Sequence, residues 1–284
     1  MRNKVIACID DSQYAQAICD YAAWSAKQMG APLSLLHVLA NLPHPSNTNL
    51  SGTIGLGSQE ALLEELAGLD ERRSKIAMEQ GKAMLQAARE RVSNHGIAEL
   101  ESRQRHGELL DTLKDLEDET RMLVVGKRGA DTASAHGHIG SHLEGIIRTM
   151  NCPVLIAQQS FTVPSQIMIA FDGSATGFKC IEMVAASPLF KGISCHLVMA
   201  GSDTPDNQAA LAKAQATLKA AGFDSNTALV AGDAEKALAD YQQQQNIDLL
   251  IMGAYGHSRI RHFIVGSTTT AMIRRTRISL LVLR

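Results

Sequence analysis

Residues 249–256 read Leu-Leu-Ile-Met-Gly-Ala-Tyr-Gly, and after nine further residues the chain continues with Gly266-Ser267. The apolar run is typical of a buried strand, and the glycines after it predict a tight turn into a helix. Glycine permits positive φ and a close approach of the backbone to a ligand, while a helix start offers unpaired N–H groups to an anion. The pattern therefore predicts a phosphate-binding loop, with a glycine turn needed only for packing as the alternative.

A weaker copy of this pattern occurs earlier in the chain. The apolar run Met122–Val125 leads into Gly126-Lys-Arg-Gly129, ten further residues and Gly140-Ser141. The beginnings of the two halves also match, because residues 4–12 align without a gap on residues 166–174, and each segment is an apolar strand that ends in Asp-x-Ser. We interpret the chain as an internal duplication.

Each copy alternates predicted strands and helices. Helices are expected near 13–29, 73–92, 175–187 and 211–221 and after each Gly-Ser pair, with strands at 4–9, 33–39, 166–171 and 194–199, before each glycine turn, and at 153–156 and 279–283. Such alternation predicts right-handed crossovers and a mainly parallel sheet covered on both faces. The expected fold is α/β, with two tandem, doubly wound, five-stranded domains at 1–159 and 160–284.

Composition narrows the classes of partner. The 284 residues carry a formal net charge of −2, which offers no general attraction to nucleic acid or to an anionic membrane. The sequence shows neither a signal peptide pattern nor an apolar stretch of membrane-spanning length, so a cytoplasmic protein is expected. The five cysteines are scattered and odd in number, which favours reduced, buried thiols over a redox or zinc site.

The candidate ligand site lies where parallel strands end. Asp10 and Asp172 end the first strand of each copy, so each should meet the glycine loop that follows the fourth strand of its own copy. Such an aspartate can accept hydrogen bonds from a ribose hydroxyl or an adenine amine, or it can cap the next helix. Basic side chains near the loops could neutralise phosphates, or they could simply be solvated side chains at a helix start: Lys127, Arg128, His257, Arg259, Arg261 and His262.

Other patterns support less specific interpretations. His136, His138 and His142 could face one metal ion, but we favour histidines beside an anion-binding loop and expect no metal. His37 and His196 are interpreted as core histidines. The glycine-rich stretch after Asn41, which precedes acidic residues 60–71, is interpreted as a linker, with a flap over the first site as the alternative. No catalytic triad, paired carboxylates, Walker lysine or catalytic cysteine is visible, so a binding protein is favoured over an enzyme.

The first-strand Asp, the Leu-His-Val second strand and the pattern Gly-x2-Gly-x9-Gly-Ser together resemble the universal stress protein (UspA) family, in its tandem-domain class. The second copy meets the glycine pattern in full, whereas the first has one extra residue between Gly129 and Gly140. The resemblance implies a Rossmann-like, adenine nucleotide alpha hydrolase-like fold in each half. It also implies a pseudo-dimer in which the last strands of the two halves pair, with a further homodimer possible.

In the ATP-binding branch of that family, the first-strand Asp, the second strand and the glycine loop hold the nucleotide. Carried over to the second copy, the resemblance implicates Phe171, Asp172, Val198, Met252, Gly253, Tyr255, Gly256, Gly266, Ser267 and Thr268. In the first copy it implicates Ile9, Asp10, Val38, Val125, Gly126, Arg128, Gly129, Gly140, Ser141 and His142.

The leading hypothesis is a cytosolic stress-response protein that binds ATP, or AMP or ADP, with or without Mg²⁺, chiefly in the second domain. A nucleotide would then act as a switch of conformation or partners. The alternatives are a stress-related interaction scaffold that binds no nucleotide, and a weak ATPase. A lipid-like ligand in an apolar crevice is a further alternative.

Overall fold

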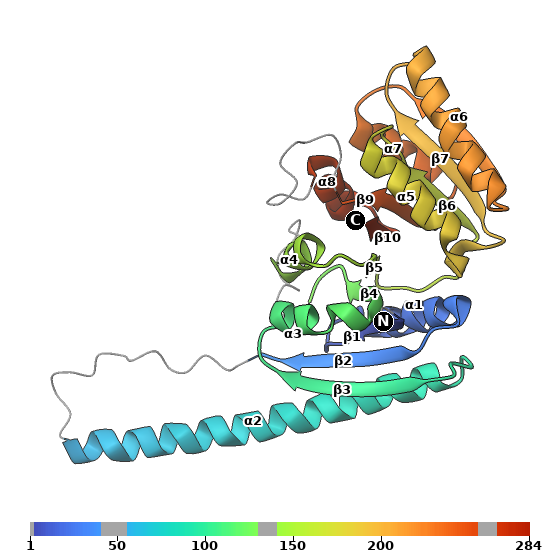
Figure 1. Ribbon diagram of the computed structural model, residues 1–284. Coiled ribbons are helices and arrows are strands. Elements are labelled where there is room, and N and C mark those ends of the chain that lie inside the picture. The colour runs from blue at the N-terminus through green and yellow to red at the C-terminus, as the bar shows by residue number, and fades with distance from the viewer. Residues whose placement is uncertain (1–2, 41–55, 130–140, 255–265) are drawn as a thin grey trace.

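The structure is a computed structural model that describes residues 3–40, 56–129, 141–254 and 266–284, with the side chains of 56–64 and 141 left out. Ten strands form a single sheet in the order β3-β2-β1-β4-β5-β10-β9-β6-β7-β8 (Figure 1). All neighbouring strands are parallel except β5 and β10, which pair antiparallel. Each half therefore contributes five strands, and the halves join through their last strands, as the family resemblance implies.

The first half follows the expected alternation. Its strands are β1 (Lys4–Cys8), β2 (Leu33–Leu39), β3 (Leu100–His106), β4 (Thr120–Gly126) and β5 (Val154–Ala157). Its helices are α1 (Ala15–Met29), α2 (Leu56–Ser93), α3 (Leu109–Asp115) and α4 (Ser141–Thr149), with the 3-10 turn η1 (Glu117–Glu119) before β4.

The second half repeats this order. Its strands are β6 (Gln166–Ala170), β7 (Ser194–Ala200), β8 (Ser225–Val230), β9 (Leu249–Gly253) and β10 (Ser279–Leu283). Its helices are α5 (Ala175–Ala186), α6 (Pro205–Ala220), α7 (Ala234–Gln244) and α8 (Ser267–Arg275), with the 3-10 turn η3 (Pro188–Phe190). The predicted domain division at 159/160 falls in the connection between β5 and β6 and stays a prediction.

Helices cover both faces of the sheet. One hydrophobic core contains buried side chains of α1, α2, α5 and α6, and the other contains side chains of α3, α4, α7 and α8. The central strands contribute to both cores, because neighbouring residues of a strand point to opposite faces. Their near-continuous apolar sequences are explained by this double burial.

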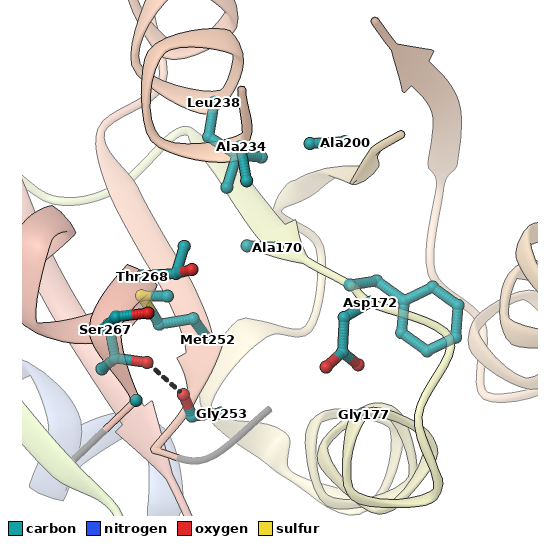
Figure 2. Close-up of a pocket in the computed structure, with 13 residues that line it drawn as sticks. Ala170, Asp172, Gly177, Ala200, Ala234, Leu238, Met252, Gly253, Ser267 and Thr268 are labelled. Atoms are coloured by element: carbon teal, nitrogen blue, oxygen red, sulfur yellow. Dashed lines mark hydrogen bonds between the residues drawn. The ribbon is translucent and has the colours of Figure 1, made fainter. Parts of the chain in front are cut away.

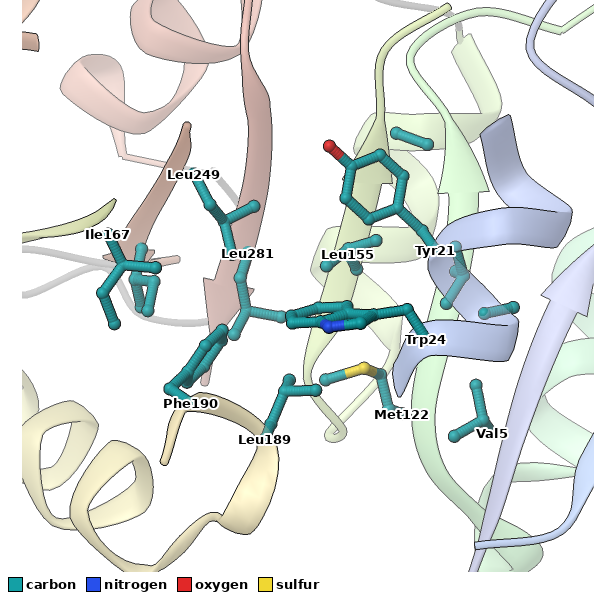
Figure 3. Close-up of a cluster of buried hydrophobic side chains, with 14 of the residues drawn as sticks. Val5, Tyr21, Trp24, Met122, Leu155, Ile167, Leu189, Phe190, Leu249 and Leu281 are labelled. Carbon is teal, nitrogen blue, oxygen red and sulfur yellow. The ribbon is translucent and has the colours of Figure 1, made fainter. Parts of the chain in front are cut away.

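The two halves share their packing at the junction. Trp24 of α1 lies beside Leu281 of β10 and Phe190 of η3, and the rings of Trp24 and Phe190 are 6.2 Å apart between centroids (Figure 3). The connection between the halves also packs on α1, because Phe161 meets Tyr21 edge-on at 4.7 Å between centroids. One core therefore crosses the junction.

Helix α2 is longer than the sequence predicts. The expected helix covers 73–92, whereas α2 begins at Leu56 and takes in the acidic stretch that we interpreted as following a linker. Residues 56–72 are rich in Leu, Ala and Glu and contain no proline, so helix propensity overrides the two glycines. The N-terminal part of α2 extends beyond the sheet (Figure 1). Residues 41–55, most of the predicted linker or flap, lie outside the described residues.

No helix in the described part of the chain is both long enough and apolar enough to cross a bilayer.

Candidate functional site

A cavity of about 340 Å³ lies at the carboxyl ends of β6 and β9. We call it the second pocket. Its wall combines the end of β6, which is the first strand of the second half, with Gly253 and the first turn of α8, as the duplication predicts. The lining residues are Ala170, Phe171, Asp172, Gly177, Ala200, Ala234, Leu238, Met252, Gly253, Gly266, Ser267, Thr268 and Thr269. This volume lies in the range of small-molecule sites.

The first turn of α8 faces this pocket. Gly266 is the N-cap residue and has no side chain with which to cap the helix, so no described side chain caps the amides of Ser267, Thr268 and Thr269. Two contacts fix the position of this turn: Gly266 N donates to Ala254 O at 3.1 Å, and Thr269 Oγ1 donates to Gly253 O at 2.9 Å. These amides, which no side chain of the described residues caps, and the positive end of the helix dipole therefore offer an anion a fixed site.

Asp172 lies across the pocket from the start of α8 (Figure 2). Its Oδ1 accepts a hydrogen bond from Ser174 N at 3.0 Å, while the Ser174 hydroxyl caps α5 by accepting from Gly177 N at 2.9 Å. The two roles that the sequence left open are thus divided: Ser174 caps the helix, and Asp172 lines the pocket.

Gly177 makes this arrangement possible, although it belongs to none of the sequence motifs described above. A Cβ at this position would lie 2.7 Å from Asp172 Oδ1 and 3.1 Å from the Phe171 ring. Glycine is therefore required for the carboxylate to rest on the first turn of α5. A sequence signal does exist, because this glycine follows the Ser174 cap within one helical turn, where other residues have better helix propensity.

A second cavity of about 360 Å³ occupies the equivalent place at the ends of β1 and β4. We call it the first pocket. Its lining residues are Cys8, Ile9, Asp10, Asp11, Leu36, His37, Val38, Leu39, Ala40, Gly107, Glu108, Leu109, Val125, Gly126, Arg128, Gly129, His142, Leu143 and Ile146. Here Asp10 Oδ1 accepts from both the backbone N and the hydroxyl of Ser12. Asp10 thus repeats the backbone contact of Asp172.

The two basic residues after Gly126, Lys127 and Arg128, contact different parts of the molecule. Arg128 lines the first pocket, and its buried Nε has no hydrogen-bond partner within the described residues. Lys127 points elsewhere, because its Nζ donates to Arg274 O at 3.1 Å and Thr276 O at 2.8 Å in the other half. Burial, together with the charge of Arg128, lowers the pKa of Lys127. The expectation that both residues face phosphate is therefore wrong for Lys127.

Most of the residues implicated in the second copy come together in the second pocket. The structure places seven of them in its wall: Phe171, Asp172, Met252, Gly253, Gly266, Ser267 and Thr268. Val198 is fully buried in β7 and does not line the pocket, whereas Ala200 does. Tyr255 and Gly256 lie outside the described residues, as do His257, Arg259, Arg261 and His262.

The register of the sheet explains why Val198 is replaced by Ala200. Cys8 pairs with Leu36 in the first half, and the equivalent Ala170 pairs with Val198 in the second. Val198 therefore corresponds to Leu36, and the position equivalent to Val38 is Ala200. The resemblance had aligned the second strands two residues out of step.

In the first copy the predicted residues also gather around one pocket. Its wall contains Ile9, Asp10, Val38, Val125, Gly126, Arg128, Gly129 and His142. Ser141 is the first residue of α4, and Gly140 lies outside the described residues.

The two strand histidines have different surroundings. His196 is buried and its Nδ1 lies 2.9 Å from the Tyr241 hydroxyl, so the core interpretation is correct for this residue. Burial lowers the pKa of His196. His37 instead lines the first pocket, and its Nδ1 donates to Ile9 O at 2.8 Å, so the core interpretation is wrong there.

All five cysteines are free thiols, as expected. Burial raises the pKa of Cys8 and of Cys195 to about 12, and the pKa of Cys19 and of Cys180 to about 11. Of the histidines considered for a metal site, His136 and His138 lie outside the described residues. The described residues contain no group of three or more acidic, histidine or cysteine side chains that could hold a metal ion.

Comparisons with known proteins agree with this architecture. The model of the universal stress protein family matches residues 1–158 and 196–284. The chain is 37% identical over 288 residues to universal stress protein Slr1230 of Synechocystis, and the match covers all of both chains. It is 22% identical over 306 residues to universal stress protein Rv2005c of Mycobacterium tuberculosis, and that match covers 99% of this chain and 96% of the relative. The crystal structure of a universal stress protein from Archaeoglobus fulgidus superposes with a TM-score of 0.71 at 19% identity, covering 100% of this chain and 99% of the other, and so supports the fold. With a repeated strand and glycine-turn pattern, paired last strands and these matches along both halves, the chain belongs to the universal stress protein family.

Proposed function

We propose that this protein binds an adenine nucleotide, ATP or else AMP or ADP, with or without Mg²⁺, chiefly in the second pocket. The nucleotide would act as a switch in a stress response. The observation that carries the proposal is the first turn of α8, whose amides are capped by no side chain of the described residues and face Asp172 across a cavity of about 340 Å³. Phosphate oxygens fit the amides, and a ribose hydroxyl or an adenine amine fits the carboxylate.

The rest of the wall suits a nucleoside. Phe171, Met252, Ala200 and Leu238 give the cavity an apolar body, and few polar groups fix the orientation of a ligand, as is usual in small-molecule sites. Asp172 is the one titratable residue among the described lining residues. A general acid and base pair for hydrolysis would need a second such group, so binding is favoured over catalysis.

The test is calorimetric titration of the full-length protein with MgATP, repeated on Asp172→Ala and on Asp10→Ala. These are the same substitution at the equivalent position of each pocket. Loss of a hydrogen bond to a charged group costs about 1.5–3 kcal/mol, so Asp172→Ala should weaken binding about 10- to 100-fold. Asp10→Ala should weaken the dominant binding event less than Asp172→Ala does.

Each contrary result has a distinct meaning. A loss of ATP affinity in Asp10→Ala with no change in Asp172→Ala would show that the main binding site is the first pocket and not the second. Absence of ATP, ADP and AMP binding in the wild-type protein would refute the nucleotide proposal and favour the interaction scaffold. Phosphate release that disappears in Asp172→Ala would favour the weak ATPase.

A further inference from the structure

The antiparallel junction places the two pockets at opposite rims of the sheet. Within each half the strands are parallel, but β5 and β10 run in opposite directions, so the carboxyl ends of the two halves point opposite ways. The helices α4 and α8 begin at their own pockets and return along the sheet to the start of β5 and β10. Each nine-residue helix, about 13 Å long, therefore ends near the rim that carries the other pocket.

Side chains from the opposite half bind the carboxyl ends of both helices. The C-terminal carbonyls of α8 accept hydrogen bonds from Lys127 Nζ, to Arg274 O at 3.1 Å and Thr276 O at 2.8 Å, and Gln158 Nε2 also donates to Thr276 O at 3.2 Å. These carbonyls lack partners inside the helix, and a cation there is favoured by the helix dipole.

The reverse connection is also present. Arg284 Nη1 donates to Arg148 O at 2.7 Å and to Met150 O at 3.2 Å, at the carboxyl end of α4. Arg284 follows Leu283, whose carbonyl accepts from Ala254 N at 2.7 Å, directly after the first glycine of the second loop. Each glycine loop is thus linked to the helix that forms part of the opposite pocket.

Lys127 connects most directly to a pocket, because it lies between Gly126 and Arg128, which both line the first pocket. Its backbone N is held by Ala157 O at 3.1 Å. Burial, and to a smaller extent the positive charge of the neighbouring Arg128, disfavours the charge on the Lys127 ammonium and lowers its pKa. An anion bound beside Arg128 would compensate the charge of Arg128 and strengthen the contact between Lys127 and the end of α8.

We propose that the two pockets are positively coupled through Lys127: an anionic ligand in the first pocket strengthens the ammonium cap on α8 and so raises the affinity of the second pocket at the other end of that helix. This inference rests on the proposed nucleotide function and specifies its regulation. By linkage, a ligand in the second pocket must raise the affinity of the first by the same factor.

A double-mutant cycle on the full-length protein tests the coupling, with MgATP as the probe and calorimetry as the readout. Gly129→Val disables the first pocket, since even a Cβ there would lie 3.3 Å from Asp10 Oδ2, and Asp10→Ala is a second disabling variant if Gly129→Val fails to fold. Lys127→Met removes the ammonium and keeps most of the stem. Lys219→Met is the matched control, because it makes the same change at an exposed lysine in the last turn of α6.

Disabling the first pocket should weaken ATP binding in the second about fivefold, within the usual range of coupling between sites. The same weakening should be seen with Lys219→Met present and should vanish with Lys127→Met present. The inference would be overturned if the coupling persisted in Lys127→Met, or if the ATP affinity of the second pocket did not change when the first pocket is disabled. Either result would leave the proposal of nucleotide binding intact. Failure of the wild-type protein to bind ATP at all would refute both proposals.

Discussion

Replacement of Glu119 by Gln should destabilise the protein at neutral pH and should cost much less in acid. Glu119 accepts hydrogen bonds from Arg103 and, at 2.8 Å, from Lys4 Nζ, and Lys4 also pairs with Glu101 at 2.9 Å. The Arg103 guanidinium and the Lys4 ammonium together lower the pKa of Glu119 to about 2 from its ordinary 4.5. The cluster ties β1 and β3 to the turn that precedes β4.

The magnitude follows from this shift. Each pKa unit corresponds to about 1.4 kcal/mol, so full linkage would give about 3 kcal/mol. The Glu119 side chain is 28% exposed, and solvent screening reduces the contribution, so we expect Glu119→Gln to cost about 1–2 kcal/mol at pH 7. Because the folded pKa is lowered, the stabilisation is fully present above about pH 5 and is lost as the pH falls through 4.5 towards 2.

Urea unfolding of the wild type and Glu119→Gln at pH 7, 5, 4 and 3 measures this difference directly. Glu71→Gln is a matched control, because Glu71 pairs with Lys75 on the exposed surface of α2 and should contribute little at any of these pH values. A difference between wild type and Glu119→Gln that stays constant from pH 7 to pH 3, or that matches the Glu71→Gln control, would show that the ion cluster does not act as described.

Three further outcomes are expected. Gly177→Ala should lower MgATP affinity about 5- to 10-fold, because its Cβ would displace Asp172 from the pocket, whereas an unchanged titration would remove that positioning role. Leu281→Ala should cost about 2–5 kcal/mol in urea unfolding, since this side chain is 2% exposed in the core that spans the junction; loss of only one half of the structure would argue against a shared core. Burial lowers the pKa of His196, so the free energy of unfolding should fall as the pH drops through about 6.5. This fall should be absent in His196→Gln. An NMR titration midpoint of His196 at or above 6.5 would contradict the prediction.

The duplication and the order of elements could be predicted from local patterns. A buried parallel strand needs a continuous apolar run, and a sharp turn into a helix favours glycine, so the segments around Gly126 and Gly253 identify β4 and β9 by themselves. The ends of the first strands were also predicted, because the Asp-x-Ser sequence supplies the pocket aspartate in both halves and, in the second half, the serine that caps α5. These features depend on neighbours in sequence.

Register and contacts between the halves could not be predicted in this way. Val198 and Ala200 are both small, apolar residues of one strand, and only the pairing of Ala170 with Val198 decides which of the two reaches the rim. Lys127 follows a glycine of the predicted phosphate loop, so the local sequence favoured a phosphate contact. Its actual partners, Arg274 O and Thr276 O, are more than 140 residues away, and they exist only because the last strands pair.

The pairing of β5 with β10 also determines which surfaces are left for association. An unpaired apolar edge strand is an aggregation liability, and both of these strands are fully buried at the centre of one sheet. The strands left at the two edges are β3 and β8. Glu101, Arg103 and Arg105 place charges along β3, and the first half of β8 is the polar run Ser225-Asn-Thr, so neither edge strand is apolar along its whole length. A homodimer, if this chain forms one, must therefore use a surface other than the last strands, because the chain already satisfies those strands internally.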